Sequence, residues 1–157
     1  MDVDKALNAA SLAPSACNRQ SFKYRIFDDP KLTKEIANIP FGTSGYADNI
    51  PMVIVVVGDL SNYFSSRDRH TIYIDAFLSV MSFMYALETL GLSSIAINWP
   101  DFGLLENRMK KKLNLKTYER PVIMLGVGYA KDEGKIPYSQ KKPLEHLRSY
   151  NVLGEKS

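Results

Sequence analysis

The sequence is poor in the residues that build disulfides, metal sites and membrane spans. Cys17 is the single cysteine, which excludes a disulfide within the chain. The two histidines, His70 and His146, are far apart, and no further cysteine or histidine clusters near them, so a zinc site has little support. The longest apolar-rich stretch, 72–92, is interrupted by polar residues such as Asp75. It therefore predicts a buried helix of a soluble protein and not a membrane span.

The chain also lacks a strong excess of one charge and an apolar leader. Its net charge is +3, and the lysines and arginines are interleaved with acids. Nucleic acid is therefore not implied as a partner, whereas an anionic ligand or cofactor would suit this balance. The start of the chain, 1–4, has neither a basic segment nor an apolar signal core, which predicts a cytoplasmic protein. Ordinary composition without repeats predicts a single domain over residues 1–157.

Apolar periodicity predicts helices and strands that alternate along the chain. Helices are expected over 3–13, 32–39, 73–90 and 104–113, and strands over 22–27, 52–57, 94–97 and 122–129. Short connections between them predict an α+β or α/β sandwich, with the strand order left open. The helix 73–90 carries two apolar stripes, so it needs a sheet on one side and another subunit on the other, unless one subunit encloses it completely. Glu106 and Lys110 are expected on a solvated helix face.

A polar loop joins the first helix to the first strand. Pro14 disfavours a helical conformation before it, and Ser15 and Asn18 are short polar residues that fold back on the backbone in turns. Such a turn leaves free N–H groups, and the small Ala16 lets a planar, polar ligand approach closely. By spacing alone, the segment is equally well explained as a structural loop.

This loop, A-P-S-A-C-N-R-Q followed by an aromatic residue and a strand, resembles the flavin-contacting loop of the nitroreductase family of FMN-dependent NAD(P)H oxidoreductases. Two further segments, 91–100 and 127–129 with 139–143 downstream, resemble the family in the same order. The resemblance implies an α+β fold with a mixed, mostly antiparallel sheet flanked by helices. It also implies an intertwined homodimer that binds flavin at the subunit interface.

The resemblance assigns site residues to each segment. The first loop would contact FMN partly from the opposite subunit, backbone N–H groups near 98–99 would bond to the ring edge that accepts hydride, and lysines near the end of the chain would hold the phosphate. No side chain is expected to act as a catalytic group, because a flavin carries the redox chemistry itself. The predicted FMN-binding residues are Pro14, Ser15, Ala16, Asn18, Asp75, Asn98, Trp99, Lys141 and Lys142.

Several of these residues have simpler interpretations. Trp99 precedes a proline and is typical of a packing residue in a loop. Lys141 and Lys142 are typical of surface charges, and Asp75 would also suit the first turns of a helix, where it stabilises the helix dipole. The segment 42–45 either lines the flavin or is a flexible loop.

One departure from the family pattern leaves two functions open. Family members carry an arginine-rich segment ahead of the first helix that binds the FMN phosphate, whereas Lys5 is the single basic residue between Met1 and Pro14. The favoured function is hydride transfer from NAD(P)H through FMN to a nitroaromatic, quinone or similar small-molecule acceptor. The alternative is a shortened relative with weak or no flavin binding that serves as a binding or structural module.

Overall fold

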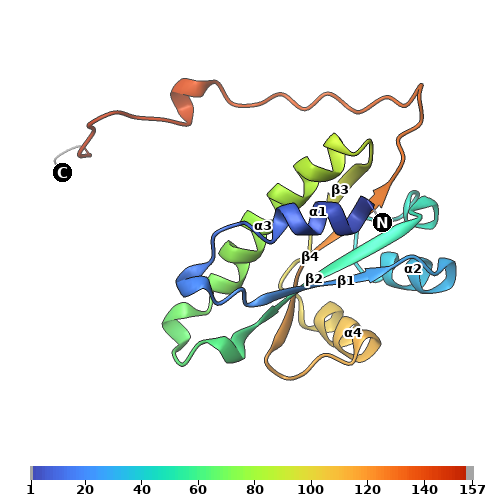
Figure 1. Cartoon of the computed structure of the whole chain (residues 1–157), viewed down its shortest axis with the longest axis horizontal. Helices are drawn as coiled ribbons and strands as arrows, with labels where there is room; N and C mark the ends of the chain where they lie inside the picture. Colours follow the sequence, from blue (N-terminus) through green and yellow to red (C-terminus); the bar gives the residue numbers. More distant parts are fainter. Residues whose placement is uncertain (1, 155–157) are drawn as a thin grey trace.

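The computed structural model describes residues 2–154 as a three-layer sandwich, in which a four-stranded sheet lies between two pairs of helices (Figure 1). The helices are α1 (Asp2–Ala10), α2 (Pro30–Ala37), α3 (Thr71–Thr89) and α4 (Gly103–Leu113), and the strands are β1 (Phe22–Phe27), β2 (Met52–Asp59), β3 (Ser93–Ile97) and β4 (Glu119–Gly128). Single 3-10 turns lie at Ala16–Asn18, Ala47–Asn49, Leu60–Asn62, Ser66–Asp68 and Leu144–His146.

The strands are ordered β1-β2-β4-β3, and each of the three pairings is antiparallel. This arrangement confirms the antiparallel character and flanking helices that the family resemblance implies. Pro121 was expected to open the last strand, but the strand begins two residues earlier at Glu119. The proline is tolerated inside β4 because the register with β2 shifts there, with Val56 opposite Ile123 and Val57 opposite Pro121.

The two faces of the sheet are covered by different helices because side chains alternate along each strand. On β2, Ile54 and Val56 pack with α1 and α3, whereas Val53, Val55 and Val57 pack with α2 and α4. All five of these side chains are at most 2% exposed. The apolar run in β2 therefore marks a central strand buried on both faces, as its sequence predicts.

Two helix boundaries differ from expectation for local reasons. Helix α1 ends at Ala10, before the predicted position, because Leu12 and Ala13 donate to carbonyls only three residues earlier as the chain approaches Pro14. Helix α2 begins at Pro30, because Asp29 caps it by accepting a hydrogen bond from the Leu32 N–H at 2.9 Å.

Helix α3 divides into a buried and an exposed apolar face. The buried face packs on the sheet and on α1, where the Ser79 hydroxyl donates to the Ala10 carbonyl at 3.1 Å. The exposed face consists of side chains between 44% and 67% exposed, which we call the α3 stripe: Ile74, Phe77, Leu78, Met81 and Tyr85. Phe77 was expected in one stripe with buried Val80 and Leu87, but it lies on the outer face.

Helix α3 also lies within the segment Ser66–Thr89, which has the length and composition of a candidate membrane span. Length and composition alone are weak evidence for a membrane span, because the core helix of a soluble protein has the same length and composition. Here the helix buries Asp75 and Ser79, two polar side chains, within the protein.

After β4, the chain leaves the sandwich as an extended tail (Figure 1). The turn at Leu144–His146 is the single helical element of the tail up to residue 154. Apolar side chains of this tail are exposed to solvent, at Ile136, Tyr138, Leu144, Leu147, Tyr150, Val152 and Leu153. In a single chain, nothing among residues 2–154 covers them.

Candidate functional site

One end of the sheet gathers two of the three segments singled out in the sequence. The register places the start of β1, at Phe22, beside the end of β2, and places Asp59 of β2 opposite Glu119 at the start of β4. Strand β3 runs towards the same end and finishes at Ile97. The segments 11–21 and 98–102 therefore emerge at this end, together with the N-terminus of α3.

Asp75 anchors the first of these segments. Its carboxylate is 3% exposed, accepts a hydrogen bond from the Ala16 N–H at 3.0 Å, and lies 3.4 Å from the Tyr63 hydroxyl. The Tyr63 hydroxyl also lies 2.7 Å from the hydroxyl of Ser21, so Asp75 and Tyr63 together link Ala16 with Ser21 at the end of the loop. Asp75 therefore positions the loop, and a direct contact of Asp75 with FMN stays a prediction.

The loop itself holds three non-glycine residues in the left-handed region, with φ of 52° at Cys17, 53° at Asn18 and 49° at Gln20. Such conformations are uncommon and need support from the surroundings. The Ser15 hydroxyl supplies some of it by accepting a hydrogen bond from the Gln20 N–H at 3.1 Å. The Cys17 N–H has no acceptor among residues 2–154, and Asn18 is exposed. The loop therefore presents polar groups in a fixed, open conformation.

The second segment separates two neighbouring predicted residues. Asn98 is exposed at the end of β3, whereas the Trp99 side chain is buried in the core that α2 and α4 share with the sheet. The Trp99 side chain is thus a packing residue, and a flavin contact by its backbone stays a prediction. Its indole Nε1–H has no hydrogen-bond partner among residues 2–154.

The third segment is not brought to this end within one chain. Strand β4 finishes at Gly128, at the opposite end of the sheet, and the tail leaves from there. Lys141 and Lys142 are exposed on this tail, and within residues 2–154 the one hydrogen bond of the Lys141 side chain is to the Ser139 hydroxyl, at 3.5 Å. The two lysines can reach a flavin held by the first two segments only if the tail folds back or belongs to another subunit.

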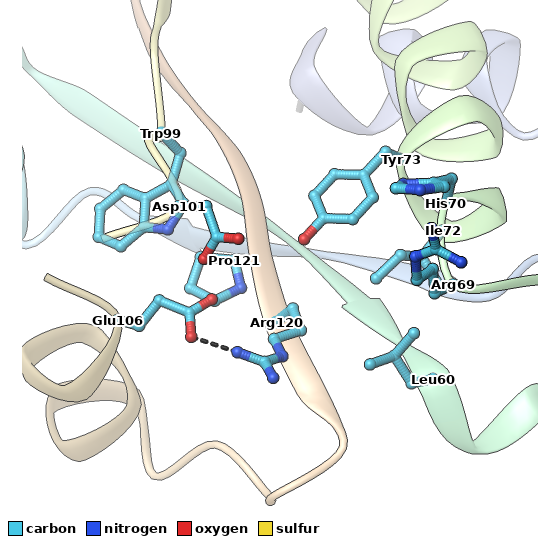
Figure 2. A pocket seen from close by; sticks show the side chains of 10 residues that line it. All are labelled: Leu60, Arg69, His70, Ile72, Tyr73, Trp99, Asp101, Glu106, Arg120 and Pro121. Carbon is cyan, nitrogen blue, oxygen red and sulfur yellow. Dashed lines mark hydrogen bonds and ion pairs between the residues drawn. The ribbon is translucent and has the colours of Figure 1, made fainter. Parts of the chain in front are cut away.

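A cavity of about 480 Å³ lies behind the second segment, and sequence reasoning missed it (Figure 2). Its polar lining comes from the N-terminus of α3, from the β3–α4 connection, from α4 and from the start of β4. The residues around it are Leu60, Arg69, His70, Ile72, Tyr73, Trp99, Asp101, Glu106, Arg120 and Pro121.

An ion pair closes one wall of this cavity and corrects one expectation. Glu106 was expected on a solvated face beside Lys110, but it is 7% exposed and forms an ion pair with Arg120. Spacing within the helix could not reveal this pair, because Arg120 belongs to β4. Across the cavity, burial raises the pKa of Tyr73, and the carboxylates of Asp101 and Glu106 raise it further.

Comparison with known proteins gives this arrangement its family. Residues 37–129 match the model of the nitroreductase family. The chain belongs to the nitroreductase family. The match covers the second segment and the strand that begins the third, whereas the loop at 13–20 lies outside it.

Two named proteins are similar to most of this chain. A protein of Archaeoglobus fulgidus, provisionally named an NADH dehydrogenase/NAD(P)H nitroreductase, is 29% identical over an alignment of 138 positions that covers 84% of this chain and 74% of that protein. Iodotyrosine deiodinase 1 of Pongo abelii is 19% identical, and its alignment covers 92% of this nitroreductase-family chain but 59% of the deiodinase.

Solved structures show the same fold. An FMN-dependent nitroreductase from Clostridium difficile superposes with a TM-score of 0.80 at 20% identity, covering 97% of this chain and 87% of that one. A nitroreductase family protein from Streptococcus pneumoniae gives a TM-score of 0.80 at 20% identity, with 96% and 88% covered. At these identities the similarity establishes the fold and leaves the ligand open.

Proposed function

We propose that this protein is an FMN-dependent oxidoreductase that takes hydride from NAD(P)H and passes reducing equivalents to a small-molecule acceptor such as a nitroaromatic or a quinone. Membership of the nitroreductase family carries this proposal. The FMN-dependent nitroreductase of Clostridium difficile, which shares the fold, supports the choice of cofactor. The proposal treats residues 1–157 as one domain and places the enzyme in the cytoplasm.

The residues at the shared end of the sheet fit a flavin. The exposed Asn18 side chain and the unpaired Cys17 N–H can donate to carbonyl and nitrogen atoms of a flavin ring, and Ala16 leaves room for a close approach. Backbone N–H groups near Asn98 would add donors from the second segment. Lys141, with Lys142 second, would pair with the phosphate as point charges.

When bound, FMN supplies the hydride-accepting and electron-donating chemistry. The chain's own contribution is to orient the ring, to keep donors at its polar edge and to leave one ring face open. Donors at that edge favour added negative charge and so ease reduction. Because NAD(P)H and the acceptor would use the same open face in turn, we expect ping-pong kinetics.

The proposed enzyme is an intertwined homodimer, and two surfaces support this. The α3 stripe presents five large apolar side chains along one helix face, and such contiguous faces mark protein interfaces. The extended tail carries exposed apolar residues that a second copy would cover. A tail that crosses to the partner could bring Lys141 towards the partner's first loop, which the tail does not approach within one chain.

Flavin occupancy of matched variants tests the site. We expect Asn18→Ala to lower the ratio of flavin to protein, whereas Asn114→Ala should leave it unchanged. Asn114 is the matched control, because its left-handed φ of 52° is close to the 53° of Asn18 and it lies at the end of α4. Because both variants carry similar backbone strain, a difference between them reports the loss of the Asn18 contact with the flavin.

A second pair tests the phosphate contact. Lys141→Ala should weaken FMN binding about ten- to a hundredfold, the worth of one charge-assisted hydrogen bond. Lys111→Ala removes an exposed lysine of α4 and should have no effect. Equal flavin affinity in all four variants and the unmodified protein would refute the site, and a protein that neither retains nor recruits FMN would favour the binding-module alternative.

A further inference from the structure

The hydroxyl of Tyr63 lies at the centre of a hydrogen-bond network that joins two connections of the fold. It lies 2.7 Å from the Ser21 hydroxyl and 3.4 Å from Asp75 Oδ2, the same oxygen that accepts the Ala16 N–H. Because a carboxylate only accepts, the network is satisfied when Ser21 donates to Tyr63 and Tyr63 donates to Asp75. Ser21 is 1% exposed and Asp75 is 3% exposed, so water has little access to these groups.

Arg19 adds a contact from the first loop, residues 13–20, to the same tyrosine. Its guanidinium carbon lies 5.3 Å from the centre of the Tyr63 ring, and its Nη1 donates to the Asn62 carbonyl. A cation over an aromatic face is an attractive contact. Tyr63 belongs to the connection between β2 and α3, residues 60–70, so this connection holds the loop near its start, in its middle and at its end.

The backbone of the loop needs this support. Cys17, Asn18 and Gln20 lie in the left-handed region, which non-glycine residues adopt infrequently, so the loop favours other conformations unless its surroundings hold it. Within residues 2–154, Tyr63 forms no hydrogen bond with Cys17 or Asn18, the residues proposed to donate to the flavin. Tyr63 therefore supports the loop through other residues and leaves those donors free.

We propose that Tyr63 is a positioning residue that holds the first loop in its flavin-binding conformation before flavin arrives. The inference rests on the proposed function and adds to its site a residue of the β2–α3 connection that does not touch the flavin. The apparent affinity for a ligand falls with the population of the conformation that binds it. Loss of the Tyr63 hydroxyl should therefore slow FMN association and leave dissociation unchanged, whereas loss of a direct contact such as that of Asn18 should speed dissociation.

Amide hydrogen exchange of the full chain without flavin tests the positioning directly. The Ala16 N–H exchanges when its hydrogen bond to Asp75 opens, so Tyr63→Phe should speed this exchange about three- to tenfold, the contribution of one hydrogen bond. Tyr24→Phe is the matched control, because the Tyr24 hydroxyl lies 2.8 Å from the Ser79 hydroxyl in a similar contact, and it should leave Ala16 unchanged. Equal exchange of Ala16 in Tyr63→Phe and in the unmodified protein would overturn the proposal.

Stopped-flow fluorescence of FMN binding tests the consequence for the cofactor. Tyr63→Phe should lower the association rate constant about three- to tenfold at an unchanged dissociation rate constant, and Tyr24→Phe should change neither. Ser21→Ala removes the other half of the same contact, so the double variant should associate no more slowly than Tyr63→Phe alone. Unchanged rate constants in Tyr63→Phe, or faster dissociation with unchanged association, would overturn the proposal. If the unmodified protein binds no FMN, the proposed function fails, whereas the exchange measurement still decides whether Tyr63 holds the loop.

Discussion

Replacing Asp75 with alanine should weaken both the fold and the flavin loop. The buried carboxylate accepts a charge-assisted hydrogen bond from the Ala16 N–H at 3.0 Å, and such bonds contribute about 1.5–3 kcal/mol. The contact with the Tyr63 hydroxyl, at 3.4 Å, is long and adds at most about 0.5 kcal/mol. We therefore expect Asp75→Ala to lower the free energy of unfolding by about 2–3 kcal/mol.

Urea unfolding followed by circular dichroism measures this loss, and the visible absorbance of purified protein measures flavin content. Flavin content should fall as well, because the left-handed loop residues lose their anchor. Asp48→Ala is the control, since Asp48 is an exposed acid whose ion pair with Lys34 lies on the surface, where such pairs contribute little to stability. If Asp75→Ala were no more destabilising than Asp48→Ala and kept its flavin, the anchoring role of Asp75 would be wrong.

Three further outcomes follow from other contacts. Met81→Glu in the α3 stripe should give a monomer in light scattering, whereas Leu104→Glu, at an exposed leucine of α4, should leave the oligomeric state unchanged. Hydrogen bonds from the Lys116 N–H and from Lys23 hold the pKa of Glu119 below 4.5, so the stability that Glu119 contributes should be lost as the pH falls below that value. In unfolding measured against pH, Glu119→Gln should reduce the loss of stability on the acid side. Burial raises the pKa of Tyr24 from 10.0 to about 12, so the contribution of Tyr24 to stability is complete below pH 10 and is lost as the pH rises from 10 towards 12. An ultraviolet titration in which no tyrosine ionises well above pH 10 would contradict this.

Elements dominated by local signals were predictable from the sequence. The apolar run of β2 indicated a central strand, and Gly91, with φ of 77°, ends α3 as expected. The start of the last strand was predicted wrongly, because Pro121 lies inside β4 and not ahead of it. There a shift in the register between two strands accommodates the residue, and that shift depends on pairing distant along the chain.

The site was only partly predictable for a similar reason. The loop at 13–20 and the turn at Asn98 lie at the same end of the sheet, and this proximity follows from strand order, which the pattern left open. The anchoring of Ala16 by Asp75 joins residues 59 positions apart, and the cavity behind Trp99 is assembled from four elements. Neither has a local signature. A contact between Lys141 and the flavin requires a tail that folds back or a second chain, and it stays a prediction.

The central claim is that this chain binds FMN and reduces it with NAD(P)H. We would record the visible spectrum of the purified protein under anaerobic conditions, first with added FMN and then with NADH or NADPH. The account predicts flavin bands close to one per chain that bleach when the nucleotide is added and return when a quinone or nitroaromatic acceptor follows. A protein that binds no flavin, or whose bound flavin neither nucleotide reduces, would contradict it.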